Sequence, residues 1–233
     1  MLDLRSKFPD FYQYHGRNIS KKLSLSNVRI LNDHYNKYSL DKKILNISSK
    51  ISTEQLLRSN LFKKIIIEVG FGDGEHLIKS ALSNPKVLFV GSEVYVNGVA
   101  KVLKKILEHD IKNIRLCGMN FVYLLNILNQ NSIDELKIIN PDPWDKKRHF
   151  KRRLINLENI IKIIGIVKNK YASYITTDSE SYFNYINEIF SSNSKIIHEN
   201  KNKILSKNDR LYGVSRYQRK AIKNGKKIYQ LTF

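Results

Sequence analysis

The spacing of hydrophobic residues changes at Lys63. Beyond this point, short runs rich in β-branched residues alternate with stretches in which apolar residues recur every three to four positions. The runs predict strands at 64–69, 86–92, 113–118, 134–140, 171–177 and 227–233. The stretches between them predict helices near 75–83, 96–109, 120–130, 151–167 and 179–191. Alternating strands and helices are typical of βαβ units, so we expect an α/β fold with a mostly parallel sheet and helices on both faces.

The length of 233 residues fits one α/β domain with extensions. We expect this domain to span 51–233 and residues 1–50 to form a basic N-terminal arm that is partly flexible. The arm holds ten Lys and Arg against four Asp and Glu, with an aromatic cluster of Phe8, Phe11, Tyr12, Tyr14 and His15 around Gly16 and Arg17. Such a segment can pair with phosphates and stack on bases, or it can be a mobile tail with one docking helix.

Other features of the composition exclude several classes of site. No apolar run reaches the roughly 18 residues of a membrane helix, and residues 1–10 carry acids with no apolar block after them. We therefore expect no membrane span, no secretory signal and a cytoplasmic location. Cys117 is the only cysteine, which excludes an internal disulfide and cysteine-based zinc sites. The six histidines do not form a ligand cluster, so we expect no metal. We expect a monomer or a homodimer.

The net charge indicates the kind of partner. Lys and Arg number 41 and Asp and Glu 21, which gives a charge of +20 and a pI near 9.9. An excess of this size favours a polyanionic partner such as nucleic acid, although biased codon usage also enriches surface lysine. Clustering is the stronger argument, and residues 201–227 hold ten Lys and Arg against one acid. We expect this C-terminal stretch to extend a nucleic-acid-binding face.

A glycine-rich turn follows the first predicted strand. The sequence Glu-Val-Gly-Phe-Gly-Asp-Gly at 68–74 places Gly70, Gly72 and Gly74 where the backbone must turn sharply and let a ligand approach. A dinucleotide fingerprint requires G-x-G-x-x-G, but Glu75 occupies the third glycine position. The spacing therefore favours S-adenosylmethionine (SAM) over NAD.

Three polar residues near strand ends are candidates for cofactor contacts. Glu93 lies 19 residues beyond Gly74, where an acid can accept hydrogen bonds from both ribose hydroxyls. Asn120 either reaches the adenine amino group or caps the following helix. Glu68 can contact the cationic methionine moiety of SAM, since a buried carboxylate needs a partner.

The sequence Asn-Pro-Asp-Pro-Trp at 140–144 follows the fourth predicted strand. Two prolines restrict the backbone on either side of Asp142, and a rigid backbone positions a reacting base. Trp144 either anchors the core or stacks on a base. Residues 144–153 hold six Lys and Arg and a single acid, which favours phosphate binding beside the site.

Asp142 also separates this segment from the Asn-Pro-Pro-aromatic loop of enzymes that methylate exocyclic amines. Guanine N7 already presents an in-plane lone pair, so its methylation mostly requires orientation and in-line approach. A carboxylate can hold the guanine N1 and N2 hydrogens and stabilise the charge that develops on the ring.

These motifs resemble the bacterial tRNA (guanine-N7-)-methyltransferase family, TrmB, over essentially the whole chain. The shared marks are the glycine loop, Pro141-Asp-Pro-Trp-x-Lys-x-Arg-His149 with Lys151-Arg-Arg, Thr177-Asp178, and Ser215-Arg-Tyr-Gln218. The resemblance implies a class I methyltransferase, Rossmann-like fold with a mostly parallel seven-stranded sheet. It implies methyl transfer from SAM to N7 of the variable-loop guanosine 46 of tRNA.

The resemblance also assigns residues to roles. It implies that the cofactor pocket is lined by Glu68, Gly70, Gly72, Glu93, Asn120 and Asp142, with Asp142 also catalytic. The residues implied to bind the substrate are Lys146, Asp178, Ser215, Arg216, Tyr217 and Gln218. Those implied to contact RNA are Arg148, His149, Lys151, Arg152 and Arg153. From its position after a strand, Asp178 can alternatively cap a helix.

The chain departs from the family pattern at the edge of the expected base pocket. Asn140 stands where the family usually has Phe, and Ser215 and Gln218 stand where it usually has Thr and Glu. Asn120 occupies a position that is often Asp. An amide at 218 still accepts a hydrogen bond but lacks the charge. Two other interpretations therefore remain open, an RNA-binding protein without the chemistry and a methyltransferase that acts on another RNA amine.

Overall fold

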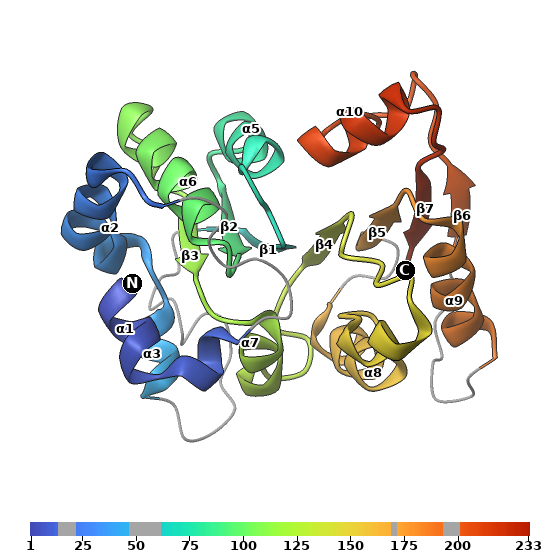
Figure 1. Cartoon of the computed structure of the whole chain (residues 1–233), viewed down its shortest axis with the longest axis horizontal. Coiled ribbons are helices and arrows are strands. Elements are labelled where there is room, and N and C mark those ends of the chain that lie inside the picture. The colour runs from blue at the N-terminus through green and yellow to red at the C-terminus, as the bar shows by residue number, and fades with distance from the viewer. Residues whose placement is uncertain (14–21, 47–61, 169–171, 193–200) are drawn as a thin grey trace.

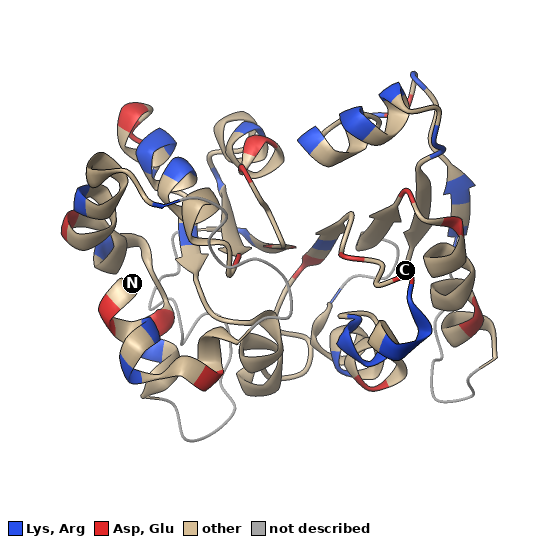
Figure 2. Cartoon of the chain, in the orientation of Figure 1, with Lys and Arg blue, Asp and Glu red and all other residues tan. Residues whose placement is uncertain are grey.

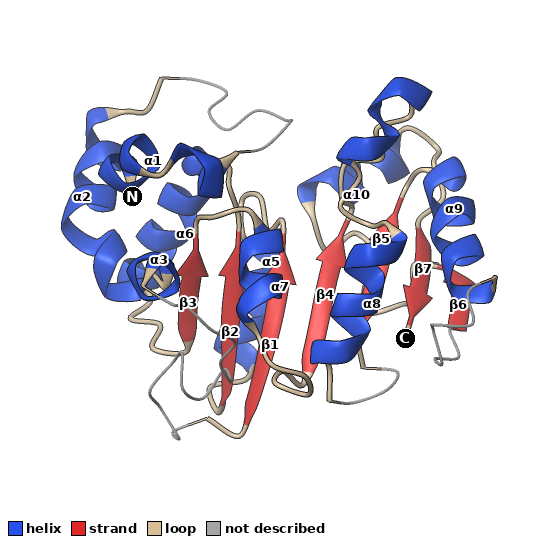
Figure 3. Cartoon of the chain, turned by 90° about the horizontal axis from the view of Figure 1, so that it is seen from below, coloured by secondary structure: helices blue, strands red, loops and turns tan. Residues whose placement is uncertain are grey.

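A seven-stranded sheet organises the computed structural model, which describes residues 1–13, 22–46, 62–168, 172–192 and 201–233. The strand order is β3-β2-β1-β4-β5-β7-β6. The strands are β1 (Lys64–Val69), β2 (Val87–Ser92), β3 (Ile114–Cys117), β4 (Glu135–Ile139), β5 (Tyr174–Thr177), β6 (Lys201–Ile204) and β7 (Tyr229–Thr232). The first five run parallel, and β7 is antiparallel to β5 and β6 (Figure 3). The expected class I methyltransferase fold is confirmed.

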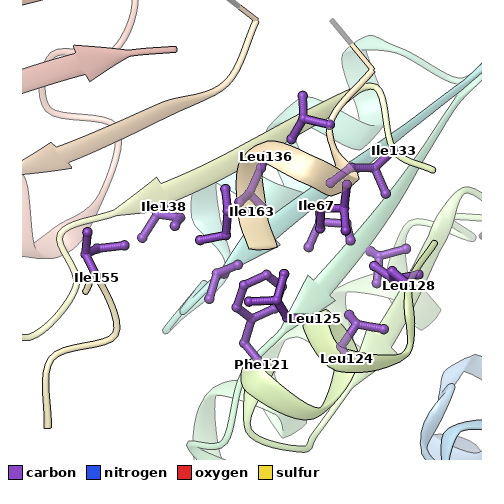
Figure 4. Close-up of a cluster of buried hydrophobic side chains, with 14 of the residues drawn as sticks. Ile67, Phe121, Leu124, Leu125, Leu128, Ile133, Leu136, Ile138, Ile155 and Ile163 are labelled. Carbon is purple, nitrogen blue, oxygen red and sulfur yellow. The ribbon is translucent and has the colours of Figure 1, made fainter. Parts of the chain in front are cut away.

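Helices cover both faces of this sheet (Figure 1). One face carries α2 (Leu25–Tyr38), α5 (Glu75–Ser83) and α6 (Val96–Glu108), whose apolar residues pack with Ile66 and Phe89. The other carries α7 (Phe121–Ile127) and α8 (Leu157–Ile166), which pack around Ile67 (Figure 4), and α9 (Glu180–Ser191), which contacts β5 and β7. Because side chains alternate along a strand, the adjacent Ile66 and Ile67 serve opposite faces.

Some elements differ from the sequence-based expectation. The helix expected over 151–167 begins only at Leu157, because residues 147–152 form a 3-10 helix, η2 (Lys147–Arg152). The strand β6 was not predicted, since all four of its residues are exposed and no apolar alternation marks it. The helix α10 (Arg216–Lys223) was also missed, because only Gln218 and Ala221 are buried within it.

The N-terminal segment packs against the β3 edge of the sheet. Its described elements are α1 (Leu2–Lys7), η1 (Pro9–Tyr12), α2 and α3 (Asp41–Leu45). The Leu40 N–H donates to the Leu116 carbonyl at 2.8 Å, and the Arg5 guanidinium donates to the Val94 carbonyl at 3.0 Å. Of the aromatic cluster expected in this arm, Tyr14, His15, Gly16 and Arg17 lie outside the described residues. Among the described helices, none has the length and apolar character needed to cross a membrane.

One buried carboxylate ties this segment to the sheet. Asp41 has no exposed surface, and its carboxylate accepts hydrogen bonds from the Tyr12 and Tyr35 hydroxyls, each at 2.8 Å. It also accepts from the Gly118 N–H at 2.9 Å, just beyond β3. Burial raises the pKa of Asp41, and these three donors oppose that rise. The bonds connect η1, α2 and the end of β3 at a single point.

We expect Asp41→Leu to lower the free energy of unfolding by about 3 kcal/mol, because three buried donors lose their acceptor while the desolvation cost of one carboxylate is removed. Urea denaturation measures the change. Asp33→Leu, on the exposed face of α2, is the control and should unfold close to wild type. Equal stability of Asp41→Leu and wild type would contradict the role given to this network.

Candidate active site

The glycine loop joins β1 to α5. Gly70, Gly72 and Gly74 have φ values of 69°, 55° and 72°, a region that other residues adopt only with strain. A Cβ on Gly74 would lie 2.0 Å from a Val102 methyl carbon, so no larger residue fits there. No atom outside its chain neighbours lies within 4 Å of the Cβ position at Gly70, so the backbone there is open to a ligand.

Glu93 closes this loop from the end of β2. Its carboxylate accepts hydrogen bonds from the Gly72 N–H and the Tyr95 N–H, both at 2.8 Å. Burial raises the pKa of Glu93, the backbone donors oppose the rise, and the charge of Asp142 adds to it. The sequence-predicted Glu93 and Asp142 therefore act electrostatically on one another across the site.

The loop forms one wall of a cleft at the carboxyl ends of the strands. Its lining combines the loop and the first turn of α5 with the start of α10, and comprises Glu68, Gly70–His76, Tyr95, Ile139 and Ser215–Tyr217. Glu68 is buried, and its carboxylate lies 2.7 Å from Nδ1 of His76. His76 was not among the predicted site residues. Its position in the first turn after the loop was the signal.

Asn120 has the geometry of a helix cap. Its Oδ1 accepts from the Val122 N–H at 3.1 Å, which makes it the N-cap of α7. Its Nδ2 donates to the Gln13 carbonyl at 3.1 Å. The structure thus gives partners to both ends of this amide, and the adenine contact stays a prediction.

The Pro-Asp-Pro turn lies between two strained residues. Asn140 and Trp144 have φ values of 50° and 47°, so the backbone is left-handed immediately before Pro141 and immediately after Pro143. Such conformations cost energy in non-glycine residues and mark constrained functional segments. Asp142 is exposed at the apex, and its charge also contributes to the raised pKa of Tyr217, which burial chiefly causes. The turn therefore holds Asp142 near enough to Tyr217, which lines the cleft, for its charge to act on that residue.

Arg153 requires a correction to its expected role in RNA contact. Its side chain is only 3% exposed, and its Nε donates to the Pro143 carbonyl at 2.8 Å. The guanidinium lies 3.7 Å from the centre of the Phe150 ring and 4.7 Å from that of Tyr182. A phosphate cannot reach a group enclosed in this way. Arg153 instead stabilises the Pro-Asp-Pro turn through its hydrogen bond to the Pro143 carbonyl.

The other basic residues of this segment form a surface. Lys146, Arg148 and Lys151 are exposed on or beside η2, and Figure 2 shows Lys and Arg gathered along η2 and α10. Arg152 lies over the Trp144 ring at 5.2 Å, and the His149 ring meets the edge of Trp144 at 5.7 Å. Trp144 is thus held among the basic side chains rather than in the core.

Asp178 follows β5 at the same edge of the sheet. Ser179, not Asp178, caps α9, because its hydroxyl accepts from the Tyr182 N–H. The Asp178 carboxylate accepts from Nδ2 of Asn140 and from Nζ of Lys226, each at 3.0 Å. The capping alternative is therefore wrong, and Asp178 is connected to the Pro-Asp-Pro turn.

The sequence 215–218 begins α10 beside the glycine loop. Ser215 is its N-cap, and Arg216 pairs with Asp73 at 3.4 Å. Tyr217 is 69% exposed, with its ring 3.8 Å from the Cβ position of Gly72. Gln218 is completely buried and its Nε2 donates to the Thr176 hydroxyl at 3.1 Å, so the structure does not place its side chain at the cleft surface, where the implied substrate contact would be made. Within the described residues, no group of three or more His, Cys, Asp or Glu can hold a metal ion.

The chain is similar in sequence to a methyltransferase family and to two tRNA (guanine-N(7)-)-methyltransferases. Residues 62–231 match the family model described as "Putative methyltransferase". The chain is 31% identical to the tRNA (guanine-N(7)-)-methyltransferase of Bartonella henselae, covering 94% of both chains. It is 30% identical to the tRNA (guanine-N(7)-)-methyltransferase of Buchnera aphidicola, covering 84% of this chain and 83% of that protein.

Other similarities cover part of a longer protein or show the fold alone. A bifunctional methyltransferase of Rickettsia felis is 37% identical over 90% of this chain, which spans only 37% of that protein's length. The crystal structure of the 16S rRNA methyltransferase KamB aligns with a TM-score of 0.56 at 12% identity, covering 80% of this chain and 94% of that one. On the family match and the relatives aligned over nearly their whole length, the chain belongs to the tRNA (guanine-N7-)-methyltransferase family.

Proposed function

We propose that this protein transfers a methyl group from SAM to N7 of a guanosine in tRNA, with the variable-loop guanosine 46 as the target. The observation that carries the proposal is the placement of Asp142. The Pro-Asp-Pro turn holds this carboxylate near the glycine loop, close enough for its charge to act on Glu93. The buried Arg153 guanidinium fixes the turn through its hydrogen bond to the Pro143 carbonyl. The family relatives support the guanine N7 chemistry.

The cleft suits SAM on its own geometry. The open backbone at Gly70 and the left-handed turns at Gly72 and Gly74 let a nucleoside approach without a side chain in the way. The Glu93 carboxylate accepts the Gly72 and Tyr95 N–H groups, and two oxygens with about four acceptor positions leave room for a ribose hydroxyl. When bound, SAM supplies a methyl group on a positively charged sulfur.

The residues of this chain orient the base for an in-line reaction. The N7 lone pair forms the new N–C bond as the C–S bond breaks, which leaves a cationic base and S-adenosylhomocysteine. No proton has to leave N7, so the enzyme needs no general base at that atom. Asp142 accepts hydrogen bonds from guanine N1 and N2, which fixes the ring and stabilises its developing positive charge.

We expect Asp142→Asn to reduce kcat/KM for methyl transfer by about a hundredfold or more, because the amide removes the charge that faces the base in the transition state. Calorimetry should show SAM affinity retained, and a tRNA binding assay should show RNA affinity retained. The control is Asp145→Asn in the same segment, whose carboxylate accepts a hydrogen bond from Ser179. Wild-type activity of Asp142→Asn would overturn the assignment.

Affinity for SAM should depend on the ionisation of Glu93. The ionised carboxylate accepts from the loop and from ribose, and protonation removes acceptor capacity. Since burial raises the pKa of Glu93, affinity should begin to fall, as the pH is lowered, at a higher pH than that at which ordinary surface carboxylates titrate. Calorimetry over a series of pH values measures the effect, and Glu93→Gln should bind weakly with little pH dependence. A wild-type affinity independent of pH would refute this.

Phosphate binding should come from the exposed residues of η2 rather than from Arg153. Replacing Arg148 and Lys151 together with Ala should weaken tRNA binding and lower the slope of log K against log salt by about 1 for each phosphate that is no longer neutralised. Lys86→Ala with Lys112→Ala is the control, because both precede strands at the opposite edge of the sheet. An unchanged salt dependence in the η2 variant would exclude this surface.

A further inference from the structure

A chain of hydrogen bonds, buried at its Gln218 end, joins Gln218 to Asn140 and Asp178. Nε2 of Gln218 donates to the Thr176 hydroxyl at 3.1 Å. That hydroxyl donates to Oδ1 of Asn140 at 3.2 Å, and Nδ2 of Asn140 donates to Asp178 at 3.0 Å. Gln218 and Thr176 have no exposed surface, so water cannot replace either partner.

The donor and acceptor roles along these hydrogen bonds are fixed independently at the Gln218 end and at the Asp178 end. At one end, the Val214 N–H donates to Oε1 of Gln218 at 3.2 Å, so the Gln218 amide must turn its NH2 group toward Thr176. At the other end, the Asp178 carboxylate can only accept, so Asn140 must turn its NH2 group toward Asp178 and its oxygen toward Thr176. Thr176 has one proton, and it accepts from Gln218 and donates to Asn140. All three side chains therefore agree on one orientation.

We infer that Gln218, Thr176 and Asn140 form a one-way hydrogen-bond relay that positions Asp178, and that Gln218 and Asn140 are a matched pair. A glutamate at 218 accepts only, so the Thr176 proton would turn toward it. Asn140 would then donate to Thr176 and turn its oxygen toward the Asp178 carboxylate, which repels it. A glutamate at 218 is thus compatible with a residue at 140 that forms no hydrogen bonds, such as Phe.

The relay makes Asn140 and Gln218 positioning residues for Asp178, a second carboxylate that the family resemblance implies in substrate binding. Asp178 retains its second partner, Lys226, when the relay is broken, so its orientation is altered without losing all its bonds. The consequence for guanine recognition rests on the proposed function. Because a bound base is held in the same way before and during methyl transfer, a misplaced Asp178 should raise KM for tRNA more than it lowers kcat.

The test measures methyl transfer by Gln218→Glu, Thr176→Val, Asn140→Phe and the double variant at 140 and 218. Gln218→Glu and Thr176→Val should each raise KM for tRNA about tenfold, the usual cost of a hydrogen bond to a charged group, with SAM affinity unchanged. The fold-increase in KM of the double variant Asn140→Phe with Gln218→Glu should be smaller than the product of the fold-increases measured for Asn140→Phe and Gln218→Glu alone. Gln230→Glu is the matched control, a buried glutamine that donates to the Thr232 hydroxyl outside the relay, and its KM should stay near wild type.

Unfolding of the same proteins tests the relay independently of activity. In a urea double-mutant cycle, the double variant at 140 and 218 should be destabilised by less than the sum of the two single variants. Additive destabilisation in the cycle, or a wild-type KM for Gln218→Glu, would overturn the inference. If the wild-type protein transfers no methyl group to tRNA, the proposed function fails, and the cycle still decides whether the relay exists.

Discussion

Parallel pairing of β1 with β2 and β4 is the constraint on which the site depends. The register pairs Val69 with Ser92 and with Ile138, so these three strands end at the same level. The glycine loop, Glu93 and the Pro-Asp-Pro turn follow directly from those ends. The pairing of Ile139 with Thr176 adds Asp178 to the same edge. Residues separated by more than a hundred positions therefore meet because the strands share one direction.

Polar groups buried beneath this edge give its loops fixed shapes. Glu93 binds two backbone N–H groups, Arg153 binds the Pro143 carbonyl, and Gln218 binds the Val214 N–H. Asp41 does the same for the N-terminal helices. Each of these hydrogen bonds gives a partner to a polar group that has lost its contact with water, and a buried polar group without a partner would destabilise the fold. The resulting rigidity suits methyl transfer, in which orientation supplies much of the catalysis.

The sequence predicted the parts of the fold that local patterns encode. The apolar runs located the parallel strands β1 to β5 and the antiparallel β7 to within three residues at each end, because these interior strands are largely buried and rich in hydrophobic residues. The exposed β6 and the polar α10 carry no such pattern. Among site residues, the glycine loop and Asp142 have recognisable local motifs. The enclosure of Arg153 by aromatic rings depends on contacts with α9, which sequence spacing does not reveal.

Mapping the product of methyl transfer is the most direct measurement of the central claim. The protein is incubated with SAM carrying a labelled methyl group and unmodified tRNA, and the labelled nucleoside and its position are identified. The proposed chemistry predicts 7-methylguanosine at a single guanosine in the variable loop. A label on an exocyclic nitrogen, or no transfer by protein that binds both SAM and tRNA, would contradict it.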